Sequence, residues 1–375
     1  MSIINAKTLR IKSFALELGF NGFGVARAES DKSVEKYKEW LDLGYEGEMS
    51  YMSRNKEKRF NLEAVLSGVK SVVCLRTNYL TVDKDMEFSL NKDRGDISLY
   101  ALNEDYHYAF TERHRELEKK IQEEFDGCQT KVYIDTGPIL EKPLAQKAGL
   151  GWIGKHTNLI TEDVGSYYFL SEILVDTILD ASEPALDRCG TCKSCIDICP
   201  TRAIVAPYVL DARKCISYLT IELKGVIPLE FRKAMGNHIY GCDDCQIVCP
   251  WNSLAVKTDE EAFFERDGSR QLIDLMLMDD ETFRKKFKGS PVKRTKRRGL
   301  LRNVAVALGN SGNLSAVDAL IGALCDHEPL IRAHVVWALG ELLREKALPI
   351  FKESLAGESE KIVNNEIKLV QATYS

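Results

Sequence analysis

The first half of the chain alternates between apolar runs of strand length and segments with helical periodicity. FGVARA (23–28) and SVVCLRTNYL (71–80) are short apolar runs, as expected of buried strands. SVEKYKEWLDLG (33–44) and ERHRELEKKIQEEF (112–125) instead repeat their apolar residues at helical spacing, which predicts amphipathic helices. We therefore predict an α/β domain over residues 1–180.

The last part of the chain, residues 256–375, has a helical pattern throughout and contains a weak internal repeat. LLRNVAVALGN (300–310) resembles LIRAHVVWALGE (330–341), and an amphipathic segment follows each copy. Paired helices at a spacing of about 30 residues are typical of HEAT-like repeats, so we predict an all-α domain of this kind. Two copies are few, and we expect them to stack on the rest of the protein.

The segment between these parts, residues 181–255, contains eight of the eleven cysteines. Its first group has the spacing Cys-x2-Cys-x2-Cys-x3-Cys-Pro of bacterial ferredoxins and consists of Cys189, Cys192, Cys195 and Cys199. Its second group lacks the first cysteine of that spacing and consists of Cys242, Cys245 and Cys249. Cys215 lies between the groups and can supply the missing ligand. This segment is therefore predicted to be a ferredoxin-like domain.

In this spacing the last cysteine of a group binds the neighbouring cluster. We therefore predict two 4Fe–4S clusters with interleaved ligands. One is bound by Cys189, Cys192, Cys195 and Cys249, and the other by Cys199, Cys215, Cys242 and Cys245. A pair of zinc sites is the alternative, because zinc also binds Cys-x2-Cys pairs, but zinc does not require the longer spacing. Two such clusters relay electrons, so residues 1–180 are expected to hold the group that receives them.

The charge of the chain is unevenly distributed. A net charge of −5 argues against a nucleic-acid partner, but between Arg284 and Arg302 there are ten Lys or Arg residues and no Asp or Glu. Such a local patch is suited to phosphate contacts, although a solvated surface is the alternative. The candidate contacts are Lys293, Arg294, Lys296, Arg297, Arg298 and Arg302.

No signal peptide and no apolar run long enough to cross a membrane is apparent. We therefore expect a cytoplasmic protein without membrane contact, in which clustered cysteines bind metal rather than form disulfides. Cys74, Cys128 and Cys325 lie outside the clustered group, and we expect them to be buried.

Residues 1–180 contain no GxGxxG motif that follows a predicted strand, no P-loop and no HExxH motif. Their distinctive segments are SYMSRNKEKRF (50–60), YALNEDYHYAF (100–110), VYIDTGP (132–138), AGLGWIGKHTNLIT (148–161) and GSYYF (165–169). With the cysteine spacing and the helical repeat, these segments resemble the epoxyqueuosine reductase family over nearly the whole chain. The resemblance implies reduction of epoxyqueuosine to queuosine at the wobble position of tRNA, by cobalamin that is reduced through the two clusters. It also implies that the α/β domain binds the corrinoid and that the HEAT-like domain binds tRNA.

The resemblance assigns roles to individual residues. Asp135 matches the proton donor of that family, and opening an epoxide leaves an alkoxide that needs a proton. A turn cap is the alternative, because Asp before Thr-Gly-Pro is common turn chemistry. The cofactor contacts, besides Asp135, are Arg59, Ser98, Tyr106, His107, Lys155, His156, Thr157, Asn158, Leu159 and Ser166. His156 is not expected to bind cobalt, because the DxHxxG signature is absent.

The partners follow from the same resemblance. We expect the anticodon stem-loop of tRNA, with Lys224 beside it, and an external electron donor such as a flavodoxin or ferredoxin. We expect the protein itself to be a monomer. Two other functions stay open: a reductive dehalogenase-type corrinoid iron–sulfur enzyme that acts on a small molecule, and a non-catalytic electron-transfer protein. The basic patch and the helical repeat favour the tRNA enzyme.

Overall fold

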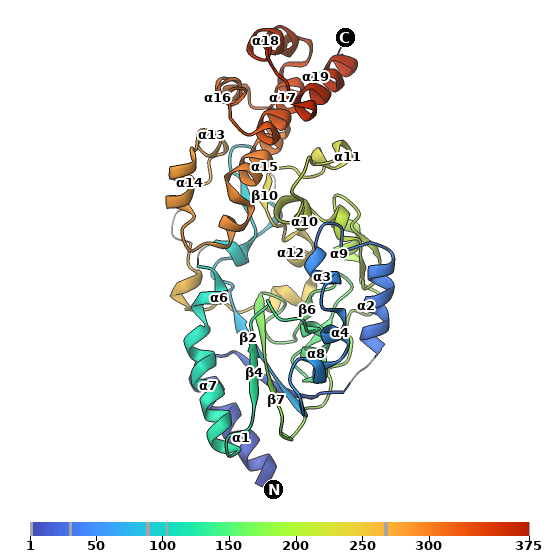
Figure 1. Ribbon diagram of the computed structural model, residues 1–375, viewed down its shortest axis with the longest axis vertical. Helices are drawn as coiled ribbons and strands as arrows, with labels where there is room; N and C mark the ends of the chain where they lie inside the picture. The colour runs from blue at the N-terminus through green and yellow to red at the C-terminus, as the bar shows by residue number, and fades with distance from the viewer. Residues whose placement is uncertain (1–2, 30–31, 88–90, 103, 266–268, 375) are drawn as a thin grey trace.

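A four-stranded sheet lies at the centre of the N-terminal part of the protein (Figure 1). In spatial order its strands are β1 (Gly22–Arg27), β2 (Ser71–Asn78), β7 (Tyr168–Val175) and β4 (Thr130–Tyr133). The computed structural model describes residues 3–29, 32–87, 91–102, 104–265 and 269–374.

Helices cover both faces of this sheet, which explains why every residue of β2 is buried. Side chains of successive strand residues point to opposite faces. Val73 therefore packs under α1 (Ile3–Glu17) and α7 (Thr111–Glu124), whereas Val72 packs under α8 (Glu141–Lys147). The two faces form separate apolar cores, and the second core lies beside the cysteine-rich segment.

The strands and long helices lie within a few residues of the predicted positions, but all pairings in this sheet are antiparallel. The N-terminal part is therefore not an α/β domain in the strict sense of a parallel sheet. Periodicity locates a strand, whereas its direction depends on the route of the connections. Strand β4 ends at Tyr133, two residues before Asp135, which has a left-handed backbone with φ of 61°.

Shorter elements surround the sheet. The short helices are α2 (Lys32–Asp42), α3 (Ser50–Ser53), α4 (Lys56–Phe60) and α6 (Tyr106–Ala109). The short strands form three pairs, β3 (Asp96–Ile97) with β10 (His238–Tyr240), β5 (Trp152–Ile153) with β6 (Leu159–Ile160), and β8 (Ile204–Ala206) with β9 (Val209–Leu210). The pair of β3 and β10 joins the N-terminal part to the segment that contains the second cysteine group.

The α-helices among the described residues of the cysteine-rich segment are all short. They are α9 (Ser194–Ile198), α10 (Ile216–Ile221), α11 (Leu229–Arg232) and α12 (Asp244–Ile247). Helices α9 and α12 each carry part of one cysteine group, and they pack against each other. Outside the two groups, Cys74 is buried as expected, whereas Cys128 is half-buried and Cys325 is exposed.

The C-terminal helices extend from the cysteine-rich segment to the end of the molecule opposite the sheet (Figure 1). They are α13 (Leu272–Met276), α14 (Asp280–Lys286), α15 (Lys296–Ser311), α16 (Val317–Ala323), α17 (Pro329–Leu343), α18 (Ala347–Ser354) and α19 (Lys361–Tyr374). The two repeat copies form α15 and α17, which pack side by side. One continuous core joins them to α10 and β10, which confirms that the repeat stacks on the rest of the protein. Among the described helices, none has the length and apolarity that a membrane crossing requires.

Candidate active site

The first group of thiols gathers around α9. Cys195 lies in this helix, Cys189 and Cys192 precede it, and Cys249 comes from the other cysteine-rich stretch, after α12. Burial, followed by the charge of Cys249 and then of Cys189 and Cys192, raises the pKa of Cys195 to about 11. Cys249 is therefore a close neighbour of the three earlier cysteines.

The second group consists of Cys199, Cys215, Cys242 and Cys245. Burial, followed by the charge of Cys242, raises the pKa of Cys215 to about 12, and Cys199 adds to this effect. Burial and then the other thiols of this group raise the pKa of Cys245 well above its ordinary value. The structure thus brings together the same two sets of four cysteines that the spacing predicts.

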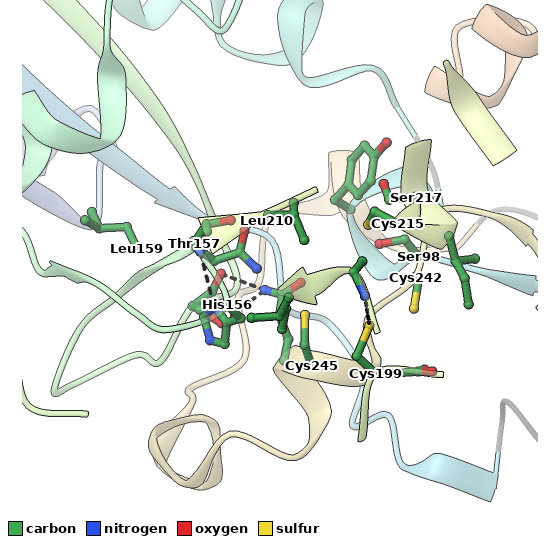
Figure 2. A pocket seen from close by; sticks show the side chains of 18 of the residues that line it. Ser98, His156, Thr157, Leu159, Cys199, Leu210, Cys215, Ser217, Cys242 and Cys245 are labelled. Atoms are coloured by element: carbon green, nitrogen blue, oxygen red, sulfur yellow. Dashed lines mark hydrogen bonds between the residues drawn. The ribbon is translucent and has the colours of Figure 1, made fainter. Parts of the chain in front are cut away.

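The second group of thiols forms one wall of a cavity of about 350 Å³ (Figure 2). Six of the predicted cofactor contacts line the same cavity, namely Ser98, His156, Thr157, Asn158, Leu159 and Ser166. Figure 2 shows His156 and Thr157 on one side and the four cysteines on the other. A group bound here would lie between a polar loop and the thiols.

The polar loop owes its shape to close backbone packing between β5 and β6. A side chain at Gly151 would place its Cβ 2.2 Å from the carbonyl oxygen of Ile160, and a side chain at Gly154 would place it 2.4 Å from Cδ1 of Ile160. Glycine is therefore required at Gly151, where the obstacle is backbone, whereas at Gly154 a larger residue would displace only the end of the Ile160 side chain. Ser98 and Ser166 support the opposite part of the lining, because their hydroxyls are hydrogen-bonded to other side chains.

Two buried polar atoms of the lining lack partners among the described residues. Nδ1 of His156 accepts a hydrogen bond from the Asn158 amide at 3.1 Å, so the proton of the neutral ring is on Nε2. Burial, followed by the charge of Lys142, lowers the pKa of His156 to about 4, so the ring is neutral at pH 7. Its Nε2 and the hydroxyl of Tyr168 are both buried and unpaired. These donors fit a ligand that carries hydrogen-bond acceptors.

Asp135 lies beside the cavity rather than in its lining. Its carboxylate accepts a hydrogen bond from the hydroxyl of Tyr106 and lies 3.7 Å from Nε2 of His107. Tyr106 stacks on Phe169, which lines the cavity, with ring centroids 4.1 Å apart. The side chain of Asp135 is 51% exposed, so a large substrate can reach it from outside.

Arg294, from the basic segment between Arg284 and Arg302, contacts Asp105 and His107, and His107 lies next to Asp135. Its Nη2 lies 2.9 Å from both carboxylate oxygens of Asp105 and 2.8 Å from Nδ1 of His107. Its guanidinium also lies over the ring of Tyr106, 5.4 Å from the centroid. Burial by itself would raise the pKa of Asp105, but the hydrogen bond of His107 and the charge of Arg294 hold it below its ordinary value. Arg294, predicted as a tRNA contact, is therefore held by Asp105 and His107.

Besides Asp135, Tyr106 and His107, two more predicted cofactor contacts lie outside the cavity lining. The ammonium of Lys155 donates to the carbonyls of Gly190 and Cys192, at 2.6 and 2.8 Å, so this residue holds the loop of the first cysteine group instead. Arg59 donates to the carbonyls of Ile139 and Tyr51, and its Nε is buried without a partner.

Two predicted tRNA contacts are wrong, because they are buried and paired within the protein. Arg302 is 1% exposed and donates to the carbonyls of Leu219 and Gly225. Arg297 is 9% exposed and pairs with Asp326. The basic run continues into a buried helix, α15, whose turn directs these side chains inward. The candidates with accessible side chains are Lys224, Lys293, Lys296, Arg294, which also pairs with Asp105, and, in part, Arg298.

Sequence reasoning missed three charged residues behind Asp135. Glu172 is fully buried in β7, and its carboxyl lies within hydrogen-bonding reach of Glu141 at the start of α8. Lys142 lines the cavity and donates to the carbonyl of Thr157 at 2.9 Å. One signal was present in the sequence, because Glu172 interrupts the apolar strand YFLSEILV.

Three segments of the chain match known families. Residues 59–136 match "Epoxyqueuosine reductase QueG, DUF1730", residues 188–252 match a "4Fe-4S double cluster binding domain", and residues 296–369 match "HEAT repeats". The second match supports iron–sulfur clusters over zinc, and the third confirms the HEAT-like repeat.

Whole proteins are similar as well. The chain is 41% identical to epoxyqueuosine reductase of Escherichia coli (strain K12), over 92% of this chain and 91% of that protein. A solved epoxyqueuosine reductase with a tRNA-Tyr epoxyqueuosine-modified stem loop has a TM-score of 0.88 and 28% identity, over 96% of this chain and 97% of that one. A Bacillus subtilis structure, described with an aspartate catalytic loop swung out of the active site, has a TM-score of 0.89 and 28% identity over 98% of each chain.

Proposed function

The chain belongs to the epoxyqueuosine reductase family, and from this premise we propose that it reduces epoxyqueuosine to queuosine in tRNA with a bound cobalamin and two 4Fe–4S clusters. One observation carries the proposal: a single cavity has four thiols on one wall and unpaired hydrogen-bond donors on another, and a half-exposed carboxylate lies beside it. Family membership and the exposed basic residues favour this function over a dehalogenase-type enzyme or a simple electron carrier.

The two groups of thiols are proposed as the cluster ligands, in the interleaved arrangement that the spacing predicts. The raised pKa values of Cys195 and Cys215 mean that cluster binding at these thiols releases protons, since iron binds the thiolate form. When bound, the clusters transfer single electrons. The second group lines the cavity directly, so its cluster would be the last electron carrier before the receiving cofactor.

Cobalamin is proposed to bind in this cavity, where Nε2 of His156 and the hydroxyl of Tyr168 would meet polar groups of the corrin. When bound, it would supply a reduced, nucleophilic cobalt centre. The buried ring of His156 is neutral and would add no positive charge beside the corrin. The lining therefore fits the cofactor through its unpaired donors.

Asp135 is proposed to deliver a proton to the oxygen that leaves the epoxide. The hydroxyl of Tyr106 and the ring of His107 hold its carboxylate in place. Asp105 and Arg294 hold His107 in turn, so the basic segment and the acid share one network. The wobble nucleotide must leave its stack to reach this group, as in other enzymes that act on a base.

The remaining proposals concern partners. Lys293, Lys296 and Arg298, with Lys224, would contact phosphates of the anticodon stem-loop. An external donor, such as a flavodoxin or ferredoxin, would supply electrons, and the protein would act as a cytoplasmic monomer. The three domains are proposed with the boundaries given above, at about residues 180 and 255.

The decisive experiment incubates anaerobically prepared protein with cobalamin, a reductant and tRNA that carries epoxyqueuosine. Nuclease digestion and mass analysis are expected to show a nucleoside lighter by the mass of one oxygen atom. Omission of cobalamin is the first control, because it leaves the clusters intact. Conversion without cobalamin would contradict the proposed cofactor, and no conversion in the complete mixture would contradict the function.

A further inference from the structure

A pair of carboxyl groups lies behind Asp135 and has no role in the mechanism above. Glu172 has 0% exposure, and neither of its oxygens has a hydrogen-bond donor among the described residues. Its carboxyl faces that of Glu141, whose Oε1 is also buried without a donor. Two buried carboxylates cannot both stay ionised at such close range, so at least one of them holds a proton.

The pair lies directly next to the proposed proton donor. The side-chain charge of Asp135 acts on both glutamates. On the sheet, Glu172 pairs with Tyr133, at the end of the strand that leads into Asp135. The glutamates and the donor thus form one connected group of three carboxyls.

The other titratable groups around the pair do not supply a full counter-charge. Cys74 of β2 pairs with Glu172 in the sheet, and burial raises its pKa well above the ordinary value, so it stays neutral. Lys142 of α8 is a nearby cation, but its side chain is exposed and its ammonium donates to the carbonyl of Thr157. Burial, followed by the charge of Asp135, raises the pKa of Glu141 to about 8. A proton is therefore retained in this pair at neutral pH.

The reaction requires more protons than Asp135 can hold. Conversion of an epoxide to an alkene breaks two C–O bonds, forms a C=C bond and releases the oxygen as water. It consumes two electrons and two protons. The electrons come from the external one-electron donor through the clusters, whereas a single carboxylic acid carries one proton.

We propose that Glu141 and Glu172 form a proton store that recharges Asp135 between the two C–O cleavages. This inference rests on the proposed function. Asp135 protonates the oxygen as the first C–O bond breaks and then takes a proton from the pair. It gives up this proton as the second bond breaks and water leaves. Asp135 and the pair each regain one proton from solvent before the next turnover. The glutamates act through Asp135 and are positioning and supply residues, not catalytic ones.

The test compares wild-type holoenzyme with Glu172→Gln and Glu141→Gln, which keep the size of each side chain. Glu112→Gln, on the exposed face of α7, is the matched control. Turnover of epoxyqueuosine tRNA is measured at pH 6 and at pH 8. Each variant of the pair is expected to lose roughly 10-fold more turnover at pH 8 than at pH 6, relative to wild type. Cluster content and cobalamin titration are expected to be unchanged.

An infrared difference spectrum between wild-type protein and each variant of the pair gives a readout that does not depend on activity. Wild-type protein is expected to show the carbonyl band of a protonated carboxylic acid at pH 7, and both variants of the pair are expected to lose it. A band that persists in both variants, or an equal loss of turnover at the two pH values, would overturn the proton store while wild-type turnover upholds the function. If wild-type protein makes no queuosine, the function fails and the proton store fails with it.

Discussion

The buried ion pair of the C-terminal helices and the lining of the cavity treat buried polar groups in opposite ways. Where the C-terminal helices meet α11, Arg232 and Glu366 are both buried and form two hydrogen bonds of 2.6 and 2.9 Å. Around the cavity, Nε2 of His156, the hydroxyl of Tyr168 and both oxygens of Glu172 are buried without partners among the described residues. The first region satisfies its buried charges internally, and the second does not.

This difference separates stability from function. An unpaired buried polar group costs roughly 1–3 kcal/mol, so it is retained where a ligand or a proton supplies the missing partner. The paired charges of the C-terminal helices contribute a rigid support that is complete without any cofactor. Changes in the two regions should therefore have different signatures, and the following predictions test this contrast from the largest expected effect to the smallest.

Loss of a cluster ligand is expected to have the largest effect. Cys215→Ser removes one thiolate from the second group, beside the cavity. Iron content is expected to fall from about eight towards about four atoms per chain, and turnover is expected to disappear because the electron path is broken. Cys325→Ser, at an exposed cysteine outside both groups, is the matched control. An unchanged iron content in the Cys215 variant would remove this residue from the ligand set.

Asp135→Asn is expected to lower turnover by roughly 10²–10⁴-fold, the usual contribution of general acid catalysis. Its side chain is half-exposed, so the thermal stability is expected to change little. The affinity for tRNA and for cobalamin is expected to stay within about 2-fold of wild type, since the substitution leaves the cavity lining intact. Unchanged turnover, measured by nucleoside mass analysis, would exclude Asp135 as the proton donor.

The cluster ligands and the surroundings of Asp135 also show how much of the structure can be predicted from the sequence. The cysteine groups follow from spacing alone, because their ligands lie a few residues apart, and the strands follow from local periodicity. The approach of Arg294 to Asp105, the burial of Arg302 and the contact of Glu141 with Glu172 depend on how distant segments pack. Periodicity within a segment carries no information about such contacts, and neither does the charge of a segment.

The buried ion pair of Arg232 and Glu366 tests the comparison in the C-terminal helices. Glu366→Leu leaves the guanidinium of Arg232 buried without its partner, and a loss of roughly 3–5 kcal/mol of unfolding free energy is expected. The double variant Arg232→Met with Glu366→Leu is expected to recover most of this loss, because it removes both charges. Turnover per folded molecule is expected to match wild type in both cases. A variant that stays folded but loses turnover would contradict the purely supporting role of this pair.

A smaller effect is expected for the unpaired ring of the cavity. His156→Phe removes the Nε2 donor but keeps an aromatic ring. One hydrogen bond contributes about 0.5–1.5 kcal/mol, so the dissociation constant for cobalamin is expected to rise by roughly 2- to 10-fold in a spectral titration. Thermal stability without cobalamin is expected to change little, because removal of the unsatisfied Nε2 offsets the loss of the hydrogen bond between Nδ1 and the Asn158 amide. An unchanged dissociation constant would exclude Nε2 as a contact of cobalamin.

The smallest effect is expected on the surface of the basic segment, where it distinguishes exposed from buried cations. Lys293→Gln combined with Lys296→Gln removes two exposed charges, and each lost phosphate contact lowers the slope of log K against log salt by roughly 0.7–0.9. Lys352→Gln, at an exposed position of α18, is the control for a general loss of charge. Arg297→Gln breaks the buried pair with Asp326, so it is expected to lower stability while the salt slope of the folded protein stays the same. A charge on an accessible side chain acts on a phosphate, whereas a charge already paired within the protein does not. Equal salt slopes for the double lysine variant, Lys352→Gln and Arg297→Gln would therefore mean that the tRNA lies on another face.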